Sequence, residues 1–299
     1  LILYNVFMPE LPEVETIVND LKKLVIGKKI TDVWIDTPKL IKHPDLTTFK
    51  NQIKGLEIKN VSRQGKNILF DLSHDYTLLI HQKMTGHLLY GKWKINGKKV
   101  IPLSNNEFNE SVNSYIHFIL FLDNFYQLAL SDLRKFAKII LDKKENILNL
   151  KELKKLGPDP LDKNFTFKKF KEVISSASPR AKIKQVLMDQ TIIAGIGNIY
   201  ADEILWWTKI HPLYSIQSLT DNELKKIYQA IKKVLKMGIK YRGASVSDYR
   251  DPLGKKGRYD QVRKVYQREN QKCYRCGHII KRIKIGGRSS CYCPHCQKI

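Results

Sequence analysis

Cysteine is scarce in this chain and is confined to one short stretch near the C-terminus. All five cysteines lie between Cys273 and Cys296, so the long segment before them contains none. A disulfide framework needs cysteines distributed along the chain that it cross-links. This distribution therefore excludes a disulfide-stapled fold and favours another use of the thiols.

Long apolar runs are missing as well. No segment approaches the roughly 20 consecutive apolar residues that a membrane-spanning helix needs. The opening stretch LILYNVF is too short for a signal peptide and lacks its basic flank. We therefore expect a soluble, intracellular protein.

Acidic residues are few relative to basic ones. The chain has 53 Lys and Arg against 29 Asp and Glu, a net charge of +24. Such a surplus favours a polyanionic partner, and nucleic acid fits best. The alternative is a solvated lysine surface without a partner. With 42% apolar residues in 299, the chain can form packed cores in about two domains.

The five cysteines contain a metal-binding pattern. Cys273 and Cys276 form one C-x-x-C pair, and Cys293 and Cys296 form another, with 293 − 276 − 1 = 16 residues between them. Two such pairs present four thiolates at about 2.3 Å from one Zn²⁺ ion, with no position left for water. The sequence thus predicts one structural zinc. Cys291 breaks the C-x-x-C spacing, and we expect it to be free.

Hydrophobic periodicity divides the chain into two parts. After Pro9, apolar residues recur at helical spacing until Gly27, which predicts one amphipathic helix. Short β-branched and aromatic segments then predict strands, and LGPDPLD at 156–162 interrupts the pattern. Helices dominate beyond it, one of them opened by a capping box from Thr220 to Glu223. The predicted strands are 29–36, 66–72, 76–81, 115–122, 126–132 and 137–141.

The stretch MPELPEVET begins at Met8. If Met8 is removed, Pro9 carries a free secondary amine, of which roughly a tenth is deprotonated at pH 7. Such an amine can attack an aldehyde carbon and form a cationic iminium. Glu10 and Glu13 lie in the first helical turn, where carboxylates are favoured and could exchange protons with the reacting centre. The alternative is an ordinary helix start with proline at its first position.

Seven motifs occur in one order along the chain: MPELPEVET, QGKNILF, IHQKMTGHL, SDLRKF, LGPDPL, IKQVLMDQTIIAGIGNIYADEILW and GRSSCYCPHCQ. Together they resemble the bacterial formamidopyrimidine-DNA glycosylase family, from Met8 to Lys298. The resemblance implies an α+β fold. An N-terminal β-sandwich carries the catalytic helix, and a helix-two-turn-helix domain with a zinc-finger hairpin follows. It also implies a monomeric repair enzyme for double-stranded DNA that contains oxidised bases or abasic sites.

The same resemblance implies catalytic roles. Pro9 matches the proline that attacks C1′ of the damaged nucleoside, and Glu10 matches the neighbouring proton donor. Glu13 matches a supporting carboxylate, and Lys66 matches a lysine that donates a proton during β-elimination. Arg288 matches the arginine that grips the phosphate.

DNA-binding roles follow in the same way. Met84, Arg134 and Phe136 match the side chains that fill the space left by a flipped base. Asn198 matches a phosphate-binding asparagine, and Arg180 matches a basic DNA contact. Tyr115 stands where the family has a DNA-contacting histidine, with His117 nearby. Four other residues depart from the family pattern, namely Gln82, Lys83, Leu133 and Ser247.

The expected domains are a sandwich at 9–150, a helix-two-turn-helix domain at 151–262 with a lesion loop, and a zinc finger at 263–299. Residues 1–8 are expected to be absent from the mature chain, because Pro9 in a peptide bond cannot form a Schiff base. Two alternatives stay open. One is an endonuclease VIII-type enzyme for oxidised pyrimidines, whose members resemble PEGPE at the start. The other is a lesion-binding protein without catalysis, if the chain begins at Leu1.

Overall fold

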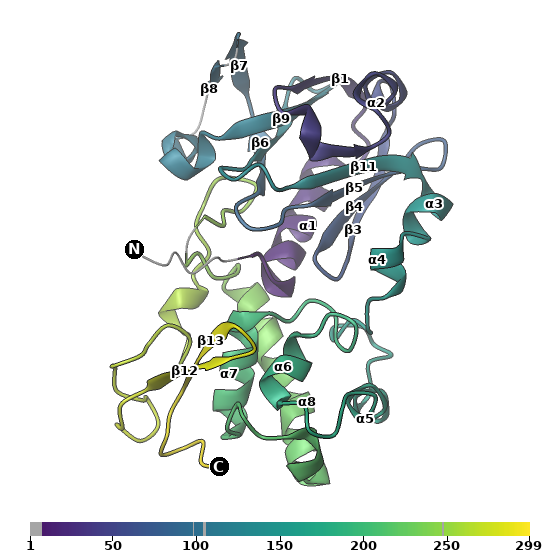
Figure 1. Ribbon diagram of the computed structural model, residues 1–299. Coiled ribbons are helices and arrows are strands. Elements are labelled where there is room, and N and C mark those ends of the chain that lie inside the picture. Colours follow the sequence, from purple (N-terminus) through teal and green to yellow (C-terminus); the bar gives the residue numbers. More distant parts are fainter. Residues whose placement is uncertain (1–7, 98, 104–105, 247) are drawn as a thin grey trace. The chain divides into compact units, whose positions relative to one another are not determined.

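The computed structural model describes residues 8–97, 99–103, 106–246 and 248–299 (Figure 1). Its contacts divide the chain into two compact units. Unit 1 comprises Leu1–Lys154 and Tyr241–Asp260, and unit 2 comprises Lys155–Lys240 and Gln261–Ile299. The segment 241–260, which the sequence analysis assigns to the helical domain, thus packs with the first half of the chain.

Unit 1 begins with helix α1, Leu11–Val25. Pro12 occupies its first turn, where a missing N–H costs nothing because that group has no partner within the helix. The apolar face of α1 is buried, and the chain turns at Gly27, which adopts a φ of +80°. The predicted helix and its end are confirmed.

Two sheets form the β-sandwich of unit 1. The strand order is β1-β9-β10-β6 in one sheet and β2-β11-β5-β4-β3 in the other. All pairs are antiparallel except β2 with β11. The strands are β1 (Ile30–Ile35), β2 (Ile41–His43), β3 (Ile58–Gln64), β4 (Asn67–Leu72), β5 (Tyr76–His81), β6 (His87–Gly91), β9 (Ile116–Leu122), β10 (Gln127–Ser131) and β11 (Lys138–Lys143).

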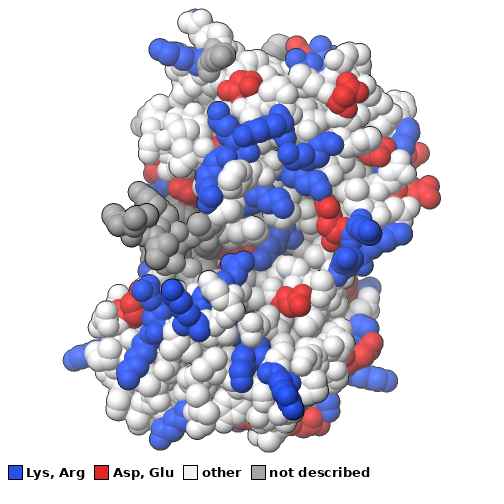
Figure 2. All heavy atoms as spheres, in the orientation of Figure 1, with Lys and Arg blue, Asp and Glu red and all other residues white. Residues whose placement is uncertain are grey.

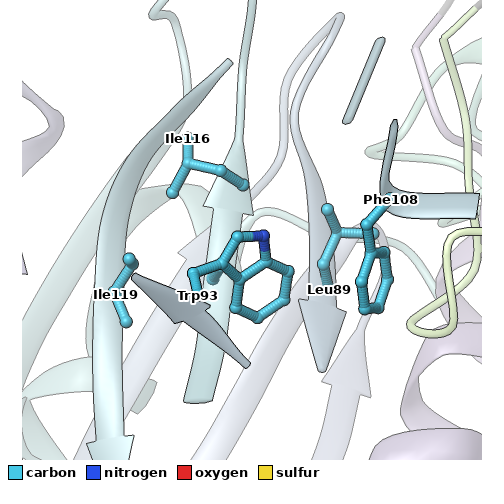
Figure 3. Close-up of a cluster of buried hydrophobic side chains, with 6 residues drawn as sticks. Leu89, Trp93, Phe108, Ile116 and Ile119 are labelled. Carbon is cyan, nitrogen blue, oxygen red and sulfur yellow. The ribbon is translucent and has the colours of Figure 1, made fainter. Parts of the chain in front are cut away.

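A small hairpin and short helices complete unit 1. These elements are α2 (Leu46–Ile53), α3 (Lys144–Leu148), α4 (Lys151–Lys154), β7 (Trp93–Asn96), β8 (Lys99–Pro102) and the 3-10 turns η1 (Pro38–Leu40), η2 (Asn106–Asn109) and η3 (Ser111–Asn113). Figure 3 shows how the hairpin is anchored: Trp93 packs with Phe108 at a ring distance of 5.0 Å, beside Leu89 and Ile119 from the sheet. This apolar cluster fixes the segment that follows the hairpin to the sandwich.

Unit 2 is helical and ends in a zinc-finger hairpin. The capping box is present: Thr220 N–H donates to Glu223 Oε2 at 2.8 Å, and Glu223 N–H donates to Thr220 Oγ1 at 3.3 Å. No helix among the described residues is long and apolar enough to cross a membrane. The elements are α5 (Phe167–Ser175), α6 (Ile183–Met188), α7 (Asn198–Thr208), η4 (Ile216–Ser218), α8 (Asp221–Lys240), β12 (Lys281–Ile285) and β13 (Arg288–Tyr292), with η5 (Tyr259–Gln261) at the boundary of the units.

Candidate active site and nucleic-acid interface

The start of α1 is buried and held by two carboxylates, since the Glu10 side chain accepts the Glu13 N–H and the Glu13 side chain accepts the Glu10 N–H. Pro9 and Glu10 directly precede the helix, and Glu10 is 3% exposed. Glu13 is fully buried; its Oε2 accepts the Glu10 N–H at 2.9 Å, and its Oε1 accepts the Ala244 N–H at 2.8 Å. Gly243 has a φ of +82°, and a Cβ there would lie 2.8 Å from Glu13 Cγ. Glu13 therefore links the predicted nucleophile's segment to the loop at 241–260, and the loop needs glycine at that contact.

Ion pairs fasten the loop at 241–260 to the rest of unit 1. The Arg242 guanidinium bridges the carboxylates of Asp20 and Asp251, with Nε 3.0 Å from Asp251 Oδ2. Arg250 is buried and donates from Nη2 to Glu110 Oε2 at 2.7 Å. This loop is thus tied to the rest of unit 1 at its start, through Arg242, and near its middle, through Arg250. Ser247, which departs from the family pattern, lies outside the described residues.

Met84, Arg134 and Phe136 are brought together by a shared hydrogen-bond network. The buried Asp132 accepts the Phe136 N–H at 2.7 Å, and its other oxygen bonds the Thr85 hydroxyl. Thr85 Oγ1 in turn accepts the Arg134 N–H at 3.0 Å. The two turns that carry the predicted wedge residues are therefore locked to each other.

Phe136 itself is 48% exposed, with the Arg134 guanidinium 4.6 Å from its ring centroid. An exposed aromatic ring on a rigid turn is available to stack against a partner. Thr85 and Asp132 were not singled out from the sequence. They could have been, because both lie within the motifs that carry the wedge residues.

A pocket of about 430 Å³ in unit 1 is bordered by two of these residues, Met84 and Phe136, and by Met8, the first residue that the structure describes. It is lined by Met8, Lys39, Lys42, Lys83, Met84, Lys135 and Phe136. Four lysines beside an aromatic ring and a thioether suit a polyanion that also carries flat apolar groups. Lys39 and Lys42 come from η1 and β2, and nothing in their local sequence distinguishes them from other lysines. On the face drawn in Figure 2, Lys and Arg side chains gather over unit 1.

Lys66 lies in the two-residue turn between β3 and β4 and is half-buried. The positive charge of Lys66 contributes to the low pKa of His81, which is about 3. Burial is the main cause, and the charges of Lys83, Lys66 and Lys138 add to it. His81 therefore stays neutral, and its Nδ1 accepts the Lys83 N–H at 2.9 Å. The predicted catalytic lysine belongs to a locally positive group.

Tyr115 is 37% exposed just before β9, and its carbonyl accepts the Asp132 N–H at 2.8 Å. It therefore lies beside the turn that carries Phe136. His117 is buried, and its Nδ1 lies 2.9 Å from Asp36 Oδ1. Of the two positions, only Tyr115 presents an exposed side chain.

In unit 2, the start of α7 holds the strand that carries Arg288. Asn198 is the first residue of α7, and its Nδ2 donates to the Ser289 carbonyl at 3.0 Å. Arg288 is exposed at the start of β13. A helix N-terminus offers free N–H groups and a positive dipole end to an anion such as phosphate. The predicted phosphate contacts Asn198 and Arg288 are thus neighbours.

A second link between α7 and the hairpin was not foreseen. Asp202 is buried; its Oδ1 lies 2.6 Å from Lys184 Nζ and bonds the Ser290 hydroxyl, and its Oδ2 accepts the Cys291 N–H at 2.9 Å. This ion pair joins α6, α7 and β13. Arg180 is exposed on the turn before α6, which is held by backbone hydrogen bonds to η4.

The four predicted cysteines converge. The Sγ atoms of Cys273, Cys276, Cys293 and Cys296 all lie within 4.8 Å of one another, and Cys276 Sγ is 3.5 Å from Cys293 Sγ. Four thiolates about a tetrahedral Zn²⁺ ion would be separated by about 3.8 Å, so the cluster fits one structural zinc. Cys291 is buried outside it, with Sγ 3.6 Å from Glu269 Oε2; burial, aided by Asp202 and Glu269, raises its pKa to about 12.

Three family models match consecutive parts of the chain. The model of the formamidopyrimidine-DNA glycosylase N-terminal domain matches residues 8–139, and the H2TH domain model of the same enzymes matches residues 156–250. A zinc finger found in FPG and IleRS matches residues 270–299. These ranges contain every predicted site residue.

Full-length relatives agree with these models. The chain is 41% identical to formamidopyrimidine-DNA glycosylase of Pelotomaculum thermopropionicum, over 98% of this chain and 100% of the relative. Its Listeria innocua counterpart is 38% identical, over 97% and 100%. A solved complex of Lactococcus lactis Fpg with DNA containing an abasic site superposes with a TM-score of 0.84 and 31% identity, over 97% and 100%. A second solved complex of the Lactococcus lactis protein, with DNA containing N7-benzyl-Fapy-dG, has a TM-score of 0.84 and 32% identity, over 97% of this chain and 100% of that chain.

Proposed function

Because the chain belongs to the formamidopyrimidine-DNA glycosylase family, we propose that it excises oxidised purines from double-stranded DNA and then cleaves the abasic strand. The substrates are 8-oxoguanine and formamidopyrimidines. The work takes place in the bacterial cytoplasm, on DNA of the nucleoid, and the enzyme acts as a monomer with one structural Zn²⁺.

Pro9 is the nucleophile. Its nitrogen attacks C1′, the bond from C1′ to the base breaks, and the base leaves with a proton supplied by Glu10. The resulting ring opens to a Schiff base between Pro9 and the sugar. This step requires Pro9 as a secondary amine, so the working protein begins at Pro9.

The Schiff base then withdraws electrons from the sugar. A proton leaves C2′ and the 3′-phosphate departs in β-elimination; a second elimination expels the 5′-phosphate and leaves a one-nucleotide gap. Lys66 acts as the proton donor of the first elimination, Glu13 supports Glu10 and the helix start, and Arg288 grips the phosphate and protonates the last leaving group.

Recognition precedes this chemistry. Met84, Phe136 and Arg134 enter the duplex when the damaged nucleotide is flipped, and Arg134 pairs with the base left opposite. Asn198, Arg180 and Tyr115 contact the backbone, and the zinc finger holds Arg288 at the phosphate. These contacts offset the free energy that is required to deform the duplex.

The pocket in unit 1 carries this proposal most directly. Met8, whose proposed removal frees the Pro9 nitrogen, lines this pocket with four lysines and with Met84 and Phe136, two of the proposed wedge residues. The test is borohydride trapping on abasic-site DNA. Protein that begins at Pro9 should form a covalent adduct, and Pro9→Gly should lose most base excision. Glu172→Gln, on an exposed helical face of unit 2, is the matched control and should trap normally. Base excision retained in full by Pro9→Gly would contradict the mechanism.

The runner-up is an endonuclease VIII-type enzyme for oxidised pyrimidines. Excision should be compared on duplexes that contain 8-oxoguanine opposite cytosine and on duplexes with thymine glycol. Faster release of the pyrimidine would support the runner-up instead. The start PELPEVET, in place of PEGPE, supports the purine enzyme.

A lesion-binding protein without catalysis is the other alternative. In that protein the nitrogen of Pro9 remains an amide, because the preceding residues are retained. Intact-mass measurement of the native protein distinguishes the two. A mass that begins at Pro9 supports the enzyme, and a mass that includes residue 1 supports the binder.

A further inference from the structure

Two exposed histidines lie directly beside the four-cysteine cluster. The rings of His278 and His295 are stacked, with centroids 4.1 Å apart and planes 11° from parallel. Cys276 Sγ and one ring nitrogen of each histidine all lie within 4.8 Å of one another. Cys276 is half-buried, whereas Cys273 and Cys293 are buried. Cys296 is half-buried as well, but Cys276 is the cysteine whose Sγ lies within reach of both histidines.

The three side chains form a second set of metal ligands. Zinc, cobalt and nickel bind imidazole nitrogen at about 2.0–2.1 Å and thiolate sulfur at about 2.3 Å, so ligand atoms around one ion lie roughly 3.3–3.6 Å apart. Because both histidines are exposed, their rings can turn out of the stacked arrangement and direct one nitrogen each at a shared ion. A thiolate bound to one zinc retains lone pairs with which it can bridge to a second ion.

The surroundings of His278 favour one ring nitrogen as the ligand. Its Nδ1 lies 3.4 Å from the Cys276 carbonyl oxygen, where an Nδ1–H donates a weak hydrogen bond. Ligating histidines commonly donate their other ring N–H to a carbonyl, which fixes the tautomer and the ring. Nε2 of His278 is then the atom presented to an ion.

We propose that Cys276, His278 and His295 form an auxiliary site for a borderline divalent ion, such as Zn²⁺, Co²⁺ or Ni²⁺. The Cys276 thiolate is shared with the structural zinc, so the finger holds two ions when the auxiliary site is filled. Both histidines are exposed on the surface of this finger, and neither belongs to the four-cysteine cluster.

Cobalt is the probe that tests this site. The full-length, zinc-loaded protein is titrated with Co²⁺, and both metals are counted after gel filtration. We expect one additional cobalt ion per chain, unchanged zinc content, and the near-ultraviolet charge-transfer absorption of a thiolate bound to cobalt. His278→Asn and His295→Asn should each lose the additional cobalt and keep the zinc.

His74→Asn is the matched control. His74 is exposed in unit 1 at a φ of 56°, a conformation that asparagine tolerates, and it should leave cobalt binding unchanged. Cobalt uptake that survives both finger variants would overturn the proposal. So would uptake without the charge-transfer band, replacement of the zinc one for one, or loss of zinc in His278→Asn. Metal counting does not depend on glycosylase activity, so this result and the function test are independent.

Discussion

At the scale of single residues, the hydrogen bonds of His81 and Glu13 are compatible with only one protonation state of each side chain. His81 accepts a backbone hydrogen bond at Nδ1, which a protonated ring could not do. Glu13 accepts two backbone N–H groups, which suits a carboxylate. Such groups fix the local geometry and also make it sensitive to pH.

His81 gives a prediction for stability against pH. Its folded pKa of about 3 lies below the usual 6.5, so the unfolded chain binds a proton that the folded chain rejects. The contribution of neutral His81 to the free energy of unfolding is therefore present in full above pH 6.5. It is lost as the pH falls towards 3, by up to about 1.4 kcal/mol per pH unit. His81→Asn keeps an acceptor but does not titrate. Its urea midpoint should therefore fall less than that of the native chain between pH 7 and pH 5.

His74→Asn serves as the control, because His74 is exposed. This variant should keep the pH dependence of the native chain. If His81→Asn also keeps it, then His81 does not set the stability in this range.

At the scale of elements, the two turns with the wedge residues are coupled through Thr85. Its hydroxyl bonds Asp132 and accepts the Arg134 N–H. Thr85→Val preserves the shape and removes the hydroxyl, which leaves buried polar groups unpaired at a cost of about 1–3 kcal/mol. We expect weaker binding to abasic-site DNA, by about tenfold or more, because Arg134 and Phe136 are no longer held in place.

Thr85→Ser retains the hydroxyl and should bind within about twofold of the native chain. Fluorescence anisotropy at constant salt measures both variants. Binding by the valine variant as tight as that of the native chain would contradict the positioning role of these hydrogen bonds.

Asp202 gives a second prediction at this scale. Asp202→Asn leaves the buried Lys184 ammonium without its carboxylate, which costs about 3–5 kcal/mol. We expect a lower melting temperature and weaker DNA binding with the zinc retained, since β13 loses a link to α7 while the four cysteines are untouched. Calorimetry, metal counting and DNA binding check the three effects.

The double variant Lys184→Met/Asp202→Asn provides the test of cause. It removes the unpaired charge and should recover part of the lost stability. A double variant less stable than Asp202→Asn alone would show that the ion pair is not the source of the loss.

Local patterns predicted much of this architecture. The helix that ends before Gly27, the capping box at Thr220 and the cysteine cluster all depend on residues close in sequence or on fixed spacing. Strands β3 and β6 were not singled out. The partner of β6 is the distant strand β10, whereas β3 pairs with β4 across a two-residue turn. The packing of the loop at 241–260 with unit 1 depends on distant contacts, such as Tyr90 N–H to the Pro252 carbonyl at 2.7 Å. Spacing alone cannot reveal such pairs.

The same limit applied to the site. Motifs identified Met84, Arg134 and Phe136, but not Lys39 and Lys42, which line the same pocket. These two lysines have no local feature that separates them from the other basic residues. Only the folding of η1 and β2 beside the wedge turns gives them a place in the site.

At the scale of the whole molecule, a net charge of +24 makes salt the main control of DNA binding. Each phosphate contact by a lysine releases counterions, and the logarithm of affinity falls with the logarithm of salt by about 0.9 per contact. Lys39→Gln and Lys42→Gln should each reduce this slope by about 1, with the same change on damaged and undamaged duplexes. Lys168→Gln, exposed on α5, is the control and should leave the slope unchanged. If all three variants reduce the slope equally, the chain binds DNA through its overall charge, and the pocket lysines have no special contact with phosphate.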